Sequence, residues 1–106
     1  MLSLPAHVML EAYSILTRLP GGLAVTGPTA ATLLTRAFPD PPLRLSGIAQ
    51  RMLPRRLAEA GVFGGSSYDG LVALEAATHS RTLLTLDRRA EPAYRKLGVP
   101  FRLLDP

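Results

Sequence analysis

Short apolar runs alternate with helix-forming segments through the second half of the chain, and this alternation constrains the fold more than any other feature. Residues 82–86 form the clearest strand, residues 99–104 form a second one, and a short helix over residues 92–97 separates them. Strands that are separated by helices pair in parallel, with the helices on the faces of the sheet. The sequence therefore predicts the α/β class, and both strands are expected to be buried on both faces.

Proline, glycine and serine mark the boundaries of the remaining elements. Helices are expected over residues 5–19, 28–38, 47–60 and 68–78, and a short strand over residues 43–45. Ser46 can cap the third helix and Gly61 can end it, whereas Pro54 is expected to kink or split it. Ser66 or Ser67 can cap the fourth helix.

Length and composition exclude several classes of protein. The chain has 106 residues, which predicts a single domain over residues 1–106. It contains no cysteine and two histidines, so thiolate zinc sites, cysteine nucleophiles and three-histidine metal sites are excluded. No apolar run approaches the ~18 residues of a membrane span, and a cytoplasmic location without membrane attachment is expected. The net charge of +4 is carried mainly by arginine, which permits a nucleic-acid partner, although codon bias explains an arginine-rich composition equally well.

Two acidic residues stand where a parallel sheet places its ligand site. Asp87 follows the strand over residues 82–86 directly, and Asp69 lies in the first turn of the fourth helix. Ligands of such sheets bind beyond the carboxyl ends of the strands. Two convergent carboxylates favour Mg²⁺ or Mn²⁺ over zinc. Each residue also has a structural explanation, because Asp87 can cap the following turn and Asp69 can interact with the helix dipole.

Glu11 is the third acidic candidate. It belongs to a helical stripe with His7, Ser14 and Arg18, and a solvated stripe with an arginine partner is the alternative explanation. Outside the acids, His79 is expected to cap the last carbonyls of the fourth helix. A cluster of arginines on the third helix is explained by a solvated face or by phosphate contacts: Arg51, Arg55 and Arg56. The chain has no nucleophile elbow of the Gly-x-Ser-x-Gly type and no phosphate-binding P-loop.

Three segments together resemble PIN-domain toxins of the VapC type. The run from His7 to Pro20 resembles the helix that carries the second acidic residue of that family, and Tyr68-Asp69-Gly70-Leu71-Val72-Ala73 resembles the segment with the third. The run from Thr82 to Ala90 resembles the strand that ends in the fourth. The resemblance covers the chain from Pro5 onward and is specific in combination.

The resemblance implies a three-layer α/β/α PIN-like sandwich and an endoribonuclease that depends on Mg²⁺ or Mn²⁺. Glu11, Asp69 and Asp87 would then be the catalytic residues and metal ligands, and Arg88 and Arg89 would help to bind RNA. The family also implies a cognate antitoxin protein as inhibitor and, commonly, a homodimer. We expect the three carboxylates to lie within several ångströms of one another.

The chain departs from the family pattern at its N-terminus. In the family an apolar strand that ends in the first acidic residue precedes the helices, whereas here ten residues precede Glu11 and none of them is acidic. The chain is therefore expected to be the C-terminal portion of a PIN-like domain, truncated at the N-terminus. The alternative function is a catalytically impaired module that binds only an antitoxin or a second copy. A general arginine-rich RNA-binding domain is disfavoured because the six aromatic residues are scattered.

Overall fold

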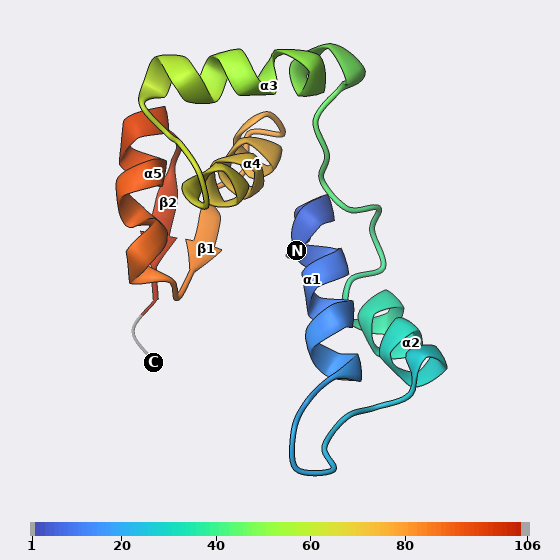
Figure 1. Ribbon diagram of the computed structural model, residues 1–106. Coiled ribbons are helices and arrows are strands. Elements are labelled where there is room, and N and C mark those ends of the chain that lie inside the picture. Colours follow the sequence, from blue (N-terminus) through green and yellow to red (C-terminus); the bar gives the residue numbers. More distant parts are fainter. Residues whose placement is uncertain (1, 105–106) are drawn as a thin grey trace. The chain divides into compact units, whose positions relative to one another are not determined.

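A computed structural model describes residues 2–104 (Figure 1). Within these residues it contains five α-helices, one 3₁₀ helix (η1) and two β-strands. The chain divides into two compact units, Met1–Leu43 and Arg44–Pro106. The single domain expected from the chain length stays a prediction. Over the described residues, every helix is too short or too polar to cross a membrane.

The first unit consists of two helices in contact, α1 (Ala6–Thr17) and α2 (Gly27–Ala37). The hydroxyl of Thr26 accepts a hydrogen bond from the Thr29 amide and so caps α2. Pro28 lies in the first turn of α2, where proline is favoured. The expected strand over residues 43–45 is reduced to an isolated parallel bridge between Pro5 and Leu43. This bridge is fixed because the Leu43 amide donates to Leu4 and the Leu43 carbonyl accepts from Ala6.

The second unit begins with two helices, of which the first has the predicted caps and the second does not. α3 (Gly47–Ala60) begins after the Ser46 cap and ends at Gly61, which has a φ of 78° and therefore adopts the left-handed conformation that favours glycine. The predicted serine cap and the predicted glycine end are both confirmed. Pro54 lies inside α3 without splitting it into two helices. α4 (Ser66–Ala77) begins earlier than expected, and the predicted Ser66 or Ser67 cap is wrong, because the cap residue is Gly65 and it makes no side-chain hydrogen bond.

A parallel two-stranded sheet forms the rest of the second unit. Leu83 of β1 (Leu83–Thr85) pairs with Phe101 of β2 (Phe101–Leu103), and the crossover between them contains η1 (Arg88–Ala90) and α5 (Glu91–Leu97). The expected parallel α/β organisation is confirmed. The expected burial on both faces is wrong for both strands. Leu84 of β1 is 44% exposed and Leu86, just after it, is 65% exposed, and Arg102 in the middle of β2 is also exposed.

The core of the second unit forms where α3, α4 and α5 meet. Gly70 of α4 lies so close to its neighbours that an added Cβ would be 2.6 Å from Leu57 Cδ2 and 3.2 Å from Leu97 Cδ1. The C-terminal ends of α3 and α5 are also linked, since the Arg56 guanidinium donates to the Leu97 carbonyl at 2.9 Å and Lys96 Nζ to the Gly61 carbonyl at 3.3 Å. This packing fixes the start of α4, which carries Asp69, against the neighbouring helices.

Candidate active site

Asp87 lies just beyond the carboxyl end of β1, as the sequence predicts. Its amide donates to Thr85 Oγ1 at 3.0 Å, which turns the chain out of the strand. Asp87 Oδ1 accepts from the Arg89 amide at 2.9 Å and contacts Arg89 Nε at 3.4 Å, so the side chain caps η1. The structural explanation of Asp87 is thus confirmed. Both of these contacts use Oδ1, so the second carboxylate oxygen of Asp87 is not engaged by Arg89.

Asp69 lies in the first turn of α4 and is partly buried. A carboxylate is stabilised at this end of a helix by the partial positive charge of the free amides. The tight packing of the next residue, Gly70, holds this turn in place. Local dipole and packing together fix the position of Asp69.

Tyr94 of α5 is influenced by the charges of both acids, although the sequence had given no reason to single it out. Its side chain is 3% exposed, and its hydroxyl lies 3.4 Å from Thr85 Oγ1. Burial raises the pKa of Tyr94, the hydrogen bond with Thr85 opposes this, and the charges of Asp69 and Asp87 raise the pKa further. Both carboxylates therefore lie within electrostatic reach of one buried hydroxyl.

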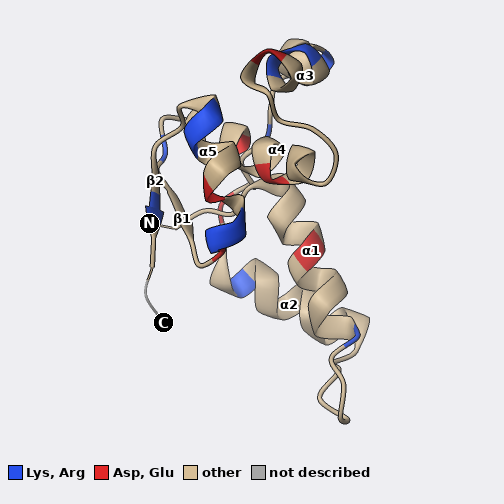
Figure 2. Cartoon of the chain, turned by 60° about the vertical axis from the view of Figure 1, so that its left-hand side comes forward, with Lys and Arg blue, Asp and Glu red and all other residues tan. Residues whose placement is uncertain are grey.

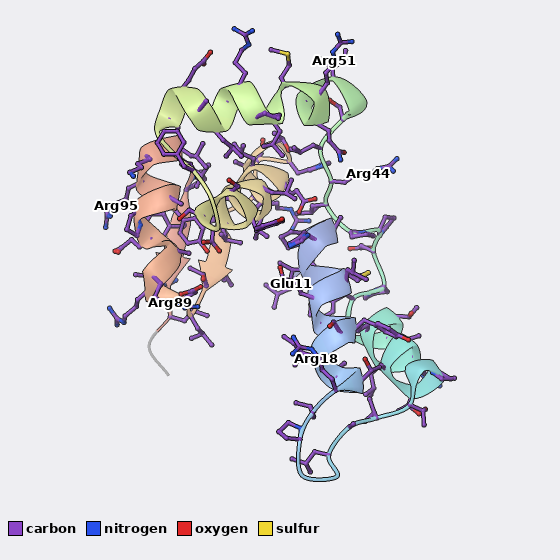
Figure 3. The ribbon with its side chains drawn as sticks, viewed as in Figure 1. Glu11, Arg18, Arg44, Arg51, Arg89 and Arg95 are labelled. Atoms are coloured by element: carbon purple, nitrogen blue, oxygen red, sulfur yellow. The ribbon has the colours of Figure 1, made fainter. Side chains whose placement is uncertain are left out.

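Glu11 lies on α1, in the first unit (Figure 3). Its Oε1 pairs with His7 Nε2 at 2.7 Å, whereas Arg18 Nε donates to Ser14 Oγ at 3.2 Å. The expected stripe therefore exists on α1, but the partner of Glu11 is a histidine and not the arginine. Over residues 2–104, neither unit by itself contains a group of three acidic, histidine or cysteine residues that could hold a metal ion.

The basic residues fall into structural and exposed groups, and Figure 2 shows them in blue. Arg88 and Arg89 both lie on η1 and are exposed, with the Arg89 side chain 93% exposed beside Asp87. Arg56 is structural, because it caps α5, whereas Arg51 on α3 is exposed. The predicted role of His79 is wrong, since its Nε2 contacts the Arg44 carbonyl at 2.8 Å in the segment before α3.

Comparison with known proteins identifies the family. The chain is 47% identical over 97 residues to Ribonuclease VapC27 of Mycobacterium tuberculosis (strain ATCC 25618 / H37Rv), and the match covers 92% of this chain and 70% of that protein. The chain belongs to the VapC-type family of PIN-domain ribonuclease toxins. It is also 37% identical over 99 residues to Ribonuclease VapC40 of the CDC 1551 / Oshkosh strain, covering 93% of this chain and 74% of that one. No family profile and no solved structure matches the chain.

Membership of the VapC family confirms the resemblance drawn from the sequence. It agrees with the parallel pairing of β1 and β2 and with the α5 crossover between them. Within the second unit, the charges of two of the acids assigned from the family motifs, Asp69 and Asp87, both raise the pKa of Tyr94.

Proposed function

We propose that this VapC-type chain is a metal-dependent endoribonuclease toxin that hydrolyses RNA phosphodiester bonds. The proposal is supported by the position of Asp87 just beyond the carboxyl edge of the sheet, by the position of Asp69 in the first turn of α4, and by the charges of both acids, which raise the pKa of Tyr94. This is the edge at which α/β proteins bind their ligands. The identity to a protein named as a ribonuclease supplies the reaction class.

The donor atoms fit a hard divalent cation. Asp69 and Asp87 offer carboxylate oxygens, which are the ligands that Mg²⁺ and Mn²⁺ prefer. Asp87 Oδ1 is engaged by Arg89, so we assign Oδ2 to the cation. Glu11 is proposed as the third ligand, through the oxygen that is not paired with His7. A bound cation of this kind activates water and offsets charge on the phosphoryl oxygens.

The remaining residues at this edge hold the acids and the substrate. Thr85 fixes the backbone of Asp87 through its hydroxyl. Tyr94 is protonated at neutral pH, as tyrosine ordinarily is, and its raised pKa extends this range to higher pH. Arg89 lies beside Asp87 with an exposed guanidinium, and Arg88 precedes it on the same turn. Guanidinium groups match the geometry of phosphate oxygens, so both arginines are proposed to bind the RNA backbone.

The proposal is tested by RNA cleavage with a defined metal supply. The purified chain is incubated with total RNA in Mg²⁺, in Mn²⁺ and in EDTA, and compared with Asp69→Asn and Asp87→Asn. Cleavage is expected only with metal, and each variant is expected to lose at least about 100-fold in rate, because each loses a charged ligand. Glu59→Gln is the matched control, since it removes one exposed carboxylate from α3. Cleavage that persists in EDTA and in both variants contradicts the proposal.

The proposed partners follow from the same family assignment. A cognate antitoxin is expected to bind and inhibit the chain, and the chain is expected to form a homodimer in the cytoplasm. The alternative function is an impaired module that only binds the antitoxin or a second copy. A chain that binds its antitoxin tightly but leaves RNA intact in Mg²⁺ and Mn²⁺ would support this alternative.

A further inference from the structure

A pocket of about 220 Å³ lies in the second unit, between the segment that follows α3 and the start of α5. Gly61 and Phe63 come from the segment after α3, whereas Pro92 and Lys96 come from α5; Arg89 of η1 and Ser66 also line it. None of these residues is one of the three acids, although Arg89 contacts Asp87. The pocket is smaller than the ~300–1,000 Å³ of sites that enclose drug-sized ligands, so it suits one unit of a longer chain.

The charge of the pocket favours an anion. Arg89 and Lys96 both line it, and no acidic residue is among its lining residues, all of which the structure describes. The ammonium group of Lys96 makes a 3.3 Å hydrogen bond to the Gly61 carbonyl, which holds it at the pocket wall without neutralising its charge. Two cations at one concave surface match the charge of a phosphate group.

An exposed aromatic ring completes the pocket. Phe63 is 69% exposed and therefore contributes little to the hydrophobic core. Aromatic rings beside cations are the arrangement by which proteins hold single-stranded nucleic acid, because bases stack on the ring while the cations follow the backbone. Phe63, Arg89 and Lys96 thus supply both kinds of contact within one pocket.

Arg89 belongs to the pocket and to the acidic site at once. Its backbone amide and its Nε contact Asp87 Oδ1 at 2.9 and 3.4 Å, and its residue lines the pocket. We propose that the pocket is an RNA subsite that binds a nucleotide next to the cleaved bond, with its base on Phe63 and its phosphate between Arg89 and Lys96. This inference rests on the proposed function, since it takes RNA as the substrate. Figure 3 shows Arg89 close to the start of α5.

The experiment reads the stacking contact directly. The chain contains no tryptophan, so F63W introduces a single tryptophan at the pocket, whose fluorescence is excited apart from that of the three tyrosines. Oligoadenylate, added in EDTA to prevent cleavage, is expected to quench this fluorescence, whereas inorganic polyphosphate, which has no bases, is expected to leave it unchanged. Binding of fluorescein-labelled oligoadenylate is followed in parallel by anisotropy, and Phe63→Ala is expected to weaken it at least about fivefold.

Lys96→Gln tests the phosphate contact, and Arg95→Gln is its matched control. Arg95 is the adjacent cation on α5 but pairs with Glu91 and lies over the Phe101 ring, outside the pocket. Lys96→Gln is expected to reduce the salt dependence of binding by about 0.7 in the log–log slope, whereas Arg95→Gln leaves the slope unchanged. Lys96→Arg is expected to restore it.

The outcomes separate this subsite from the proposed function. If labelled oligoadenylate binds the wild-type chain but F63W is not quenched and Lys96→Gln binds with an unchanged slope, the subsite is overturned and the ribonuclease proposal stands. If the wild-type chain binds no RNA, both are overturned. Thermal melting checks that each variant is folded. F63W keeps an aromatic ring at an exposed position, so its quenching decides the question even if Lys96→Gln fails to fold.

Discussion

Gly70 is the position at which a single methyl group should disturb the second unit most. An added Cβ would meet Leu57 Cδ2 at 2.6 Å, Leu97 Cδ1 at 3.2 Å and Val62 Cγ1 at 3.6 Å. Carbon atoms in contact prefer about 3.5–4.0 Å, so the Leu57 methyl group has to move by about 1 Å. Leu57 and Leu97 are buried between helices, which limits the space into which they can move.

Two opposing effects decide the stability of Gly70→Ala. Overpacking of a core costs typically about 1–3 kcal/mol, whereas replacement of glycine by alanine inside a helix gains about 1 kcal/mol. The expected net loss is therefore about 0–2 kcal/mol in the free energy of unfolding. Gly70→Val adds two further methyl groups and loses part of the helix gain, so its loss is expected at or above the upper end of the ~1–3 kcal/mol range.

Urea unfolding followed by far-UV circular dichroism measures these differences. Gly47→Ala is the matched control, because it also replaces a helical glycine but nothing lies within 4 Å of its Cβ. It is expected to be as stable as the wild type or slightly more stable. If Gly70→Ala gains stability by the full helix propensity of about 1 kcal/mol, the close packing of α4 against α3 and α5 is refuted.

Three further predictions follow from the site and the sheet. The pKa of Tyr94 is higher in the folded chain than in the unfolded chain, where it is about 10. The contribution of Tyr94 to the free energy of unfolding is therefore fully present below pH ~10 and is lost as the pH rises through the folded pKa. Thermal melts at increasing alkaline pH should show a smaller fall for Tyr94→Phe than for the wild type or for Tyr13→Phe. Asp87→Asn should keep the cap on η1 and lower the free energy of unfolding by less than about 0.5 kcal/mol, whereas Asp87→Ala should lower it by about 1 kcal/mol. Both variants should abolish cleavage. Chemical denaturation and RNA assays of the same preparations test these expectations. The exposed Leu84 and Leu86 should make the isolated chain self-associate, and a double Leu84→Lys, Leu86→Lys variant should reduce the elution size on gel filtration. A sharply melting wild-type monomer would show that this apolar surface needs no cover.

Local signals in the sequence predicted the helix ends where the chain itself supplies the cap. Ser46 and Gly61 bound α3 as expected, because a serine hydroxyl and a left-handed glycine act within a few residues. The start of α4 was misplaced because backbone groups serve there instead. The amide of Ser67 donates to the Gly64 carbonyl, and the amide of Tyr68 donates to the Gly65 carbonyl. With these donors satisfied, the helix begins without a serine cap.

Contacts between distant residues could not be predicted from one sequence. His79 stands where a helix cap is common, but the Arg44 carbonyl, 35 residues away, is its partner. For the acidic site, the strand end and the helix start were sufficient to place Asp87 just beyond β1 and Asp69 in the first turn of α4. Tyr94 was missed because nothing near it in sequence shows that its hydroxyl meets Thr85, nine residues earlier across the crossover.

The reciprocal links between the C-terminal ends of α3 and α5 have a consequence for local opening. Arg56 satisfies the last carbonyl of α5, and Lys96 satisfies the carbonyl of Gly61, so neither helix end can fray without loss of a bond to the other. The two last turns should therefore exchange their amide hydrogens at similar rates, as one cooperative segment. Lys96 also lines the pocket beside Phe63, so a phosphate that attracts it away from Gly61 would loosen the end of α3. Occupation of the pocket would then be visible as faster hydrogen exchange in a helix that the ligand does not touch.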